Sequence, residues 1–273
     1  MREAEVDSRV RQHDGWIIRE QGSPDATHAV LLLPGGLCSS VWYDDLLAEP
    51  AMADASLRFV ATTLPGFAGT PPLPDANMEN YPQLAAKLAA DLGCDVVVGH
   101  SMGANVALEM VATKAFAGPV VLISPAFSRQ DEAKFLRALD RLAVVFGHLP
   151  FAFMLKMIGP AMKKEVPPAR RDVLIADLKN NDPRFMRRQM RAYLEHFDRH
   201  GSLAKRLCDS GVPAWVAFGE HGDTGLTEDE RRVLEGCPHV TLVTIPETGH
   251  ASLNQKPDRI AELVLAAVSS LPA

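Results

Sequence analysis

The feature that most constrains the fold is a run of apolar residues that passes directly into a serine between two glycines. Residues 95–105 read Asp-Val-Val-Val-Gly-His-Ser-Met-Gly-Ala-Asn. The valines predict a buried strand, and the apolar positions that follow predict an amphipathic helix. Such an abrupt change forces Ser101 into a strained backbone conformation, and Gly99 and Gly103 avoid a collision because they have no side chain. The stretch therefore predicts either a nucleophilic serine or a tightly packed strand–helix turn.

Short apolar runs alternate with helical patterns along much of the chain. The clearest predicted strands are residues 29–33, 58–62, 95–98, 119–124, 214–218 and 240–245, with a possible antiparallel edge strand at 15–20. The predicted helices are residues 81–92, 102–113, 228–235 and 257–270. Strands separated by helices form mainly parallel sheets that are covered by helices on both faces. We therefore expect an α/β fold with a mostly parallel, doubly wound sheet.

The strand pattern stops between residues 126 and 205. Helical patterns occupy residues 135–146, 150–162, 168–180 and 183–199 instead. This segment holds 16 Lys and Arg against 9 Asp and Glu, although the whole chain has a formal net charge of −6. We therefore expect a basic helical insertion at 126–205 between two parts of one α/β core, residues 1–125 and 206–273.

Composition excludes several classes of protein. With 47% apolar and 23% charged residues, the chain has the composition of a soluble globular protein. Its acidic balance gives no indication of a nucleic-acid partner, and it has neither a signal-peptide pattern nor an apolar run that could span a bilayer. The four cysteines have no metal-site spacing and are expected to be reduced thiols, mostly buried. We expect a cytoplasmic protein without a metal, a nucleic-acid partner or membrane insertion; the sequence leaves its oligomeric state open.

An activated serine needs a base, and nine histidines are available. His250 follows the predicted strand at 240–245, so it reaches the carboxyl edge of the sheet, where open α/β sheets build their sites. His100 is expected to point away from Ser101. Six other histidines are expected to be solvated: His13, His28, His148, His196, His200 and His239.

The loop after the predicted strand at 214–218 offers two acids that could orient this base. It reads Gly-Glu-His-Gly-Asp-Thr-Gly over residues 219–225. We favour Asp223 as the acid and expect Glu220, directly after the strand, to form hydrogen bonds within the loop. His221 remains a candidate for a substrate contact.

Acyl transfer also needs donors for a developing oxyanion. The first long strand ends in Pro-Gly-Gly-Leu at residues 34–37, which allows backbone N–H groups to face the serine. We expect one donor to be Gly36 or Leu37 and the second to be Met102, at the start of the helix after Ser101.

Together these residues resemble the α/β-hydrolase superfamily over nearly the whole chain. The order Ser101, Asp223, His250 is the order that this superfamily uses. Two further segments match it: Leu-Pro-Gly-Phe-Ala-Gly-Thr at 64–70, and Gly-His before a Pro-led final helix at 249–258. The resemblance implies a sheet of about eight strands, a helical cap inserted after the sixth strand, and no cofactor.

The chain departs from the superfamily pattern at three places. The oxyanion turn usually begins His-Gly, whereas Pro34 precedes the glycines here. Thr63 stands where an aspartate is common before Leu-Pro-Gly, and Asp223 comes one position later than the usual acid. Ser101 itself excludes the members that use an aspartate nucleophile.

The function expected from these residues is hydrolysis of small to medium carboxylic esters through an acyl-enzyme, with a small-molecule substrate as the partner. The cap residues expected to line the pocket are Phe146, Phe151, Met154 and Met157. Four arginines of one predicted helix are expected either to form a solvated face or to steer an anionic substrate: Arg184, Arg187, Arg188 and Arg191.

Three alternatives stay open at this point. The same triad serves carbon–carbon bond hydrolases and cofactor-free perhydrolases, which the sequence separates poorly from esterases. Acyl transfer to an acceptor other than water is the second alternative, and it would need a drier pocket. From another class, a non-catalytic small-ligand binding protein or receptor could keep the pocket. The complete set of serine, acid and histidine argues against this last alternative because binding does not require all three.

Overall fold

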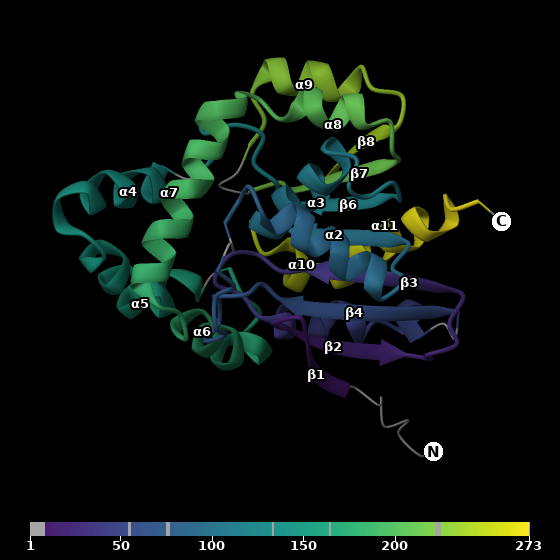
Figure 1. The fold of residues 1–273 in the computed structure, drawn as a ribbon, viewed down its shortest axis with the longest axis horizontal. Coiled ribbons are helices and arrows are strands. Elements are labelled where there is room, and N and C mark those ends of the chain that lie inside the picture. The colour runs from purple at the N-terminus through teal and green to yellow at the C-terminus, as the bar shows by residue number, and fades with distance from the viewer. Residues whose placement is uncertain are drawn as a thin grey trace.

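An eight-stranded sheet forms the centre of the computed structural model, with the strand order β1-β2-β4-β3-β5-β6-β7-β8 (Figure 1). The structure describes residues 9–53, 56–74, 77–132, 134–163, 165–221 and 225–272. Neighbouring strands from β4 to β8 are parallel, whereas β2 is antiparallel to both β1 and β4. The strands are β1 Arg9–His13, β2 Trp16–Gly22, β3 His28–Leu33, β4 Leu57–Thr63, β5 Val96–His100, β6 Val120–Ile123, β7 Ala214–Gly219 and β8 Val240–Ile245. The expected mostly parallel sheet is confirmed.

The position of the predicted edge strand needs a correction. Residues 15–20 contribute to β2, which is antiparallel as expected, but β1 pairs with it and forms the edge. The β1 sequence, Arg-Val-Arg-Gln-His, has one apolar residue, and Val10 is 67% exposed. A strand with no buried face lacks the alternating apolar pattern that predicts strands from sequence.

Helices cover both faces of the sheet because successive side chains of a strand point to opposite faces. In β3, Leu31 and Leu33 pack with α2, α3 and α8, whereas Val30 and Leu32 pack with α1 and α11. The helices are α1 Asp44–Leu47, α2 Tyr81–Asp91, α3 Met102–Ala112, α4 Lys134–Phe146, α5 Leu149–Met162, α6 Arg171–Lys179, α7 Pro183–His200, α8 Ala204–Ser210, α9 Glu228–Glu235, α10 Ser252–Gln255 and α11 Pro257–Ser269. Short 3₁₀ turns lie at Ser40–Tyr43, Pro50–Ala53 and Pro168–Arg170.

The helices α4 to α7 follow β6 and lie together at one end of the sheet (Figure 1). Proline lies in the first turn of α5 and of α7, since the first turn does not need the N–H that proline lacks. In α7 the side chain of Asp182 also caps the start by accepting a hydrogen bond from Arg184 N. These four helices are called the α4–α7 segment below.

The expectation of four free thiols is wrong for two cysteines. Cys208 on α8 and Cys237 just after α9 form a disulfide, with their Cα atoms 5.8 Å apart. Cys38 and Cys94 are free and buried, as expected. The two bonded residues are 29 positions apart, so only the packing of α8 beside α9 brings them together.

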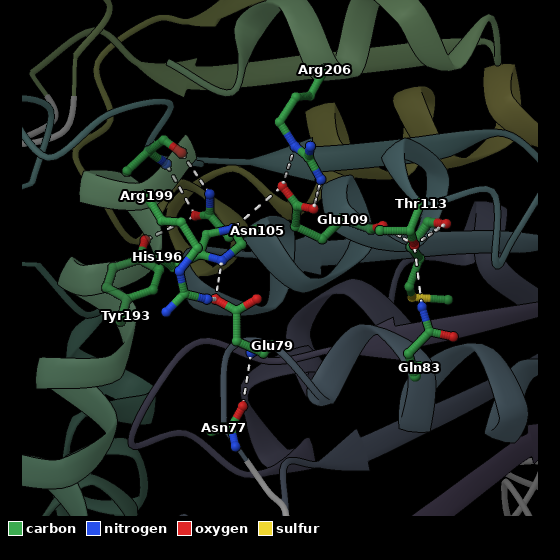
Figure 2. Close-up of polar contacts among 12 residues, drawn as sticks. Asn77, Glu79, Gln83, Asn105, Glu109, Thr113, Tyr193, His196, Arg199 and Arg206 are labelled. Carbon is green, nitrogen blue, oxygen red and sulfur yellow. Dashed lines mark hydrogen bonds and ion pairs between the residues drawn. The ribbon is translucent and has the colours of Figure 1, made fainter. Parts of the chain in front are cut away.

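A buried ionic network joins the α4–α7 segment to the rest of the molecule (Figure 2). Glu109 on α3 is 2% exposed and accepts hydrogen bonds from Arg206 Nε at 3.0 Å and Nη2 at 2.5 Å. His196 on α7 places Nε2 3.3 Å from Glu109 Oε1 and Nδ1 2.9 Å from Glu79 Oε1. The expectation that His196 is solvated is therefore wrong: it lies on the face of α7 that packs against α3.

The network favours the charged forms of its members. Burial alone would raise the pKa of Glu109, but hydrogen bonds from His196 and Arg206 outweigh it and lower that pKa from 4.5 to about 2. Burial alone would lower the pKa of His196, but hydrogen bonds to Glu109 and Glu79 raise it above 6.5. The Glu109 contribution to stability is thus present above pH 4.5 and lost as the pH falls towards 2. The His196 contribution is present below pH 6.5 and lost as the pH rises through its folded pKa.

No helix in the described part of the chain is both long enough and apolar enough to span a bilayer.

The substitution Glu109→Gln should lower the free energy of unfolding by about 3 kcal/mol at about pH 5.5, because it leaves Arg206 and a charged His196 without their buried counter-charge. The difference in the free energy of unfolding between the variant and the wild type should be smaller at about pH 3.5, because the charged Glu109 carboxylate stabilises the wild type less at that pH. Urea denaturation at both pH values measures this. Glu262→Gln is the control, since its pair with Arg259 is exposed and should contribute under about 0.5 kcal/mol. An equal difference at both pH values would contradict the electrostatic account.

Candidate active site

Ser101 lies where β5 ends and α3 begins, in a conformation that non-glycine residues rarely adopt. Its φ is 51° and its ψ is −120°. The Ser101 N–H donates to Ile123 O at 2.8 Å, and the Ser101 carbonyl accepts from Ala104 N at 2.9 Å. The neighbouring strand and the first helical turn therefore hold the strained conformation from both sides.

The two flanking glycines are required by close packing of the backbone. Neither has a positive φ. A Cβ on Gly99 would lie 2.6 Å from Ala104 Cα, and a Cβ on Gly103 would overlap the carbonyl oxygen of Leu33. Any side chain at these positions would push α3 away from the ends of β3 and β5, so the glycines allow the turn that places Ser101.

The turn after β3 packs directly against this elbow. A Cβ on Gly35 would lie 3.3 Å from Ser101 Cβ, and one on Gly36 would lie 3.6 Å from Met102 Sδ. Leu37 has a φ of 74°, which bends the chain sharply at this point. The structure therefore brings Gly36, Leu37 and Met102, the three residues expected to supply oxyanion donors, to the same cavity as Ser101.

Residues of the α4–α7 segment fix this turn. Asp177 on α6 accepts hydrogen bonds from Ser39 N at 2.8 Å and from Trp42 Nε1 at 3.1 Å. Asn181, just after α6, donates from Nδ2 to Leu37 O at 2.9 Å. The burial of Asp177 raises the pKa of its carboxyl above the ordinary value. The candidate oxyanion turn is therefore positioned by a helix that is remote in the sequence.

A cavity of about 110 Å³ adjoins Ser101. The elbow and the turn after β3 form one side of it, and helices α4, α5 and α7 form the other. The apolar side chains that line it are Leu37, Phe67, Met102, Leu136, Phe151, Met154, Met186 and Met190. Three polar side chains also line it: Glu132, Gln189 and Tyr193.

The pocket residues expected from the sequence divide into two pairs. Phe151 and Met154 line the cavity. Phe146 and Met157 do not line it and are 55% and 47% exposed. Phe146 is the last residue of α4, and Met157 lies on the side of α5 that faces away from the buried positions of that helix.

The contribution of α7 to the cavity was not expected from the sequence. Its lining residues there are Met186, Gln189, Met190 and Tyr193, at spacings of three and four that place them on one face. The arginines of the same helix do not line the cavity. Arg184, Arg187 and Arg188 are exposed, and Arg191 pairs with Asp140 at 2.9 Å. The apolar spacing of α7 was the signal that could have revealed the wall.

Hydrogen bonds of the Tyr193 hydroxyl hold the polar wall of the cavity together. Tyr193 Oη lies 2.9 Å from both Asn105 Oδ1 and Glu132 Oε1. The Ala126 N–H donates to Asn105 Oδ1 at 3.2 Å and its carbonyl accepts from Asn105 Nδ2, which fixes the amide orientation. A hydroxyl donates one hydrogen bond at a time, so Asn105 Oδ1 and Glu132 Oε1 share Tyr193 Oη as a donor.

His250 lies in the loop between β8 and α10, beside the elbow. Its carbonyl oxygen accepts a hydrogen bond from His100 Nε2 at 3.0 Å, and Ser124 Oγ donates to the same oxygen at 3.4 Å. The rings of His250 and His100 are 5.2 Å apart between centroids. The residue before Ser101 therefore holds the backbone of the predicted base.

The two candidate acids have different positions with respect to the described structure. Asp223 lies outside the described residues. Glu220 accepts a hydrogen bond from Glu247 N at 2.9 Å, as expected for a residue that fastens the loop. His221 is largely exposed and pairs with Glu220 at 3.7 Å. Glu220 therefore has a structural partner in the neighbouring loop.

Groups of three or more side chains that could ligate a metal ion occur at two places in the described chain, and neither lines the cavity. One group is Glu79, His196 and His200, and the other is His13, Asp14 and Asp91.

Comparison with known proteins identifies the family. A family model described as the alpha/beta hydrolase family matches residues 30–263. The chain belongs to the alpha/beta hydrolase family. No curated protein matches the sequence.

Solved structures of alpha/beta hydrolases resemble the whole chain at low sequence identity. An esterase from Thermogutta terrifontis has a TM-score of 0.73 at 18% identity, over 97% of this chain and 98% of that one. An esterase from Rhodococcus sp. has a TM-score of 0.70 at 20% identity, over 97% and 99%. A proline iminopeptidase from Mycobacterium smegmatis has a TM-score of 0.64 at 17% identity, over 95% and 96%. These likenesses show the fold alone.

The substitution Gly103→Ala should lower both stability and turnover. Its Cβ would overlap backbone atoms that have no flexible side chain to move, so α3 must shift, at a cost of about 1–3 kcal/mol. A shift of this kind displaces Ser101 and should lower kcat/KM roughly tenfold or more. Thermal unfolding and ester turnover measure the two effects. Gly225→Ala is the control, since its Cβ would meet no atom within 4 Å; equal effects of both substitutions would contradict this explanation.

Proposed function

We propose that this alpha/beta hydrolase cleaves small to medium carboxylic esters through an acyl-enzyme on Ser101. The observation that carries the proposal is the shared cavity: Ser101 lines it together with Gly36, Leu37 and Met102. Backbone N–H groups beside a nucleophile can stabilise the negative charge that develops on a carbonyl oxygen. A strained serine and candidate donors at one cavity are the parts that acyl transfer needs.

In the first half of the reaction, His250 accepts the proton of Ser101 Oγ while Oγ attacks the ester carbonyl. The C=O bond becomes a single bond, and its oxygen carries the negative charge towards the amides of Met102 and of Gly36 or Leu37. The intermediate then reforms the carbonyl, and the alkoxide leaves with the proton from His250. The product is an ester between the acyl group and Ser101.

In the second half of the reaction, water is the nucleophile and Ser101 Oγ is the leaving group. His250 accepts a proton from water, whose oxygen attacks the acyl carbonyl, and the resulting intermediate expels Ser101 Oγ. The proton returns from His250 to the serine, and the carboxylic acid leaves. Asp223 orients His250 and stabilises its charged form in both halves.

The α4–α7 segment acts as the cap of this site, within an insertion at residues 126–205. Its supporting features are the cavity wall from α4, α5 and α7 and the hydrogen bonds from Asp177 and Asn181 to the oxyanion turn. Methionine side chains adapt to different shapes. Three methionines of this segment line the cavity, and Met102 lines it from the opposite wall. A small cavity with flexible walls suits a range of short acyl groups.

A purely binding role gives no reason for the strain at Ser101. A positive φ at a residue with a side chain costs on the order of 1–3 kcal/mol and persists only where the surroundings enforce it. A ligand-binding cavity could be built here with an unstrained residue. A reacting hydroxyl explains this conformational free energy, because the strained turn exposes Ser101 Oγ to the cavity.

The substitution Ser101→Ala should lower turnover of p-nitrophenyl butyrate by roughly 10⁴-fold or more, because it removes the nucleophile. Release of p-nitrophenol measures turnover, and a fluorophosphonate probe should label the wild type and not the variant. The control is Ser269→Ala, at an exposed serine near the end of α11. Full activity of Ser101→Ala, or no turnover and no labelling of the wild type, would contradict the proposed function.

The two candidate acids can be separated by a pair of substitutions. Asp223→Asn should lower kcat by roughly 10³–10⁴-fold, because the amide cannot stabilise the charged imidazole. Glu220→Gln should lower kcat less than about tenfold, since the amide oxygen can still accept the Glu247 N–H. Steady-state kinetics on p-nitrophenyl acetate measures both. A larger loss in Glu220→Gln would assign the acid to Glu220.

A further inference from the structure

Two histidines and a glutamate meet on the side of α7 that faces the α/β core. His196 and His200 are four residues apart on α7, which places them on one face, and their ring centroids are 4.6 Å apart. Glu79, from the segment just before α2, places Oε1 2.9 Å from His196 Nδ1 (Figure 2). One donor atom from each of the three residues lies within 4.8 Å of the other two. The cluster therefore combines ligands from two separate parts of the chain.

We propose that Glu79, His196 and His200 bind one divalent transition-metal ion, with Zn²⁺ the best match. Two imidazole nitrogens and a carboxylate oxygen form a ligand set that Zn²⁺ accepts, with water as the fourth ligand of a tetrahedral centre. Two histidines four residues apart on a helix are a common way to present two ligands to one ion. This site is separate from the cavity at Ser101 and does not depend on the proposed reaction.

A buried carboxylate already orients one of the ligands. Glu109 Oε1 lies 3.3 Å from His196 Nε2, on the opposite side of the ring from Glu79. In this structure Nδ1 donates its proton to Glu79, because a carboxylate can only accept. A metal ion takes the place of that proton, and the N–H of Nε2 stays directed at Glu109. Metal-bound histidines commonly donate their second N–H to a carboxylate, which fixes the tautomer and the ring orientation. Arg206 holds Glu109 in its charged form by two hydrogen bonds, so this acceptor is always in place.

The separation between Glu79 and His196 is close to the one that a metal ion requires, and the donor atom of His200 lies within 4.8 Å of both. Bonds of about 2.0–2.2 Å at a tetrahedral angle place two ligand atoms about 3.3 Å apart. The contact between Glu79 and His196 must therefore widen from 2.9 Å by a few tenths of an ångström. The Glu79 side chain is 42% exposed, so it can rotate and also gives an ion access from solvent.

One nearby cation competes with the metal ion. Arg199 Nη1 lies 2.6 Å from the same oxygen of Glu79, and its side chain is 56% exposed. Binding of the ion must displace this guanidinium. Removal of the Arg199 charge should therefore strengthen binding, an effect that general destabilisation of the protein would not produce.

The second cluster in the described chain is a poorer site. His13, Asp14 and Asp91 include a single histidine, and Lys87 Nζ bonds both carboxylates, at 2.7 and 2.5 Å. The ammonium group thus already neutralises these acids. This cluster supplies a matched control for the proposal.

Titration of the untagged, EDTA-treated full chain with Zn²⁺ by calorimetry tests the site. We expect one ion per chain, and a rise in Tm of roughly 5 °C or more at about 100 times Kd. His200→Gln and Glu79→Gln should each weaken binding at least about tenfold and abolish most of the Tm rise. These variants leave the buried His196 in place, so circular dichroism can verify that they fold.

Arg199→Gln should bind Zn²⁺ more tightly than the wild type, and His13→Gln should bind it equally well. Co²⁺ serves as a second probe, since a tetrahedral centre with nitrogen and oxygen ligands gives intense visible absorption that His200→Gln should lose. Absence of stoichiometric binding would overturn the proposal. So would loss of binding in His13→Gln with full binding in His200→Gln, because the ion would then occupy the other cluster.

Discussion

The close approach of α3 to the ends of β3 and β5 is the constraint on which the site depends. Glycine at 99 and 103 permits this approach, since a single extra carbon at either position would meet backbone atoms. Ser101 has no room to relax and keeps its positive φ, held by hydrogen bonds to β6 and to the first turn of α3. The same approach brings Met102 next to the turn at Gly36, which hydrogen bonds with Asp177 and Asn181 also hold in place.

The helix α7 connects the chemistry of the cavity to the stability of the molecule. Tyr193 and Gln189 face the cavity, whereas His196 enters the network around Glu109. Burial of charged groups costs solvation energy that their attraction only partly offsets, so a network of this kind contributes more to the position of a helix than to net stability. A charge change at His196 would therefore act on the helix that lines the cavity.

The sequence predicted the elements whose pattern is local. The valines of β5 form a fully buried strand, and Ser101 follows it in the strained turn that Gly-x-Ser-x-Gly indicates. Prediction failed where a pattern was weak or where partners were distant. The polar strand β1 was missed because neither face is buried, and the pairing of Cys208 with Cys237 depends on two helices packing together. His196 was expected to be solvated because it lies in the predicted helical insertion, and its partners Glu109 and Glu79 are remote in the sequence.

By itself, the sequence determined the α/β alternation, the order of the chemical groups and the strain at Ser101, because each depends on residues that are adjacent in the chain. The tertiary structure decided which side chains reach the cavity. Phe151 and Met154 line it while Phe146 and Met157 do not, although all four are apolar residues of neighbouring helices. The physical reason is that a helix has a periodic surface, and its rotation against the sheet, set by packing far away in sequence, selects the face that is buried.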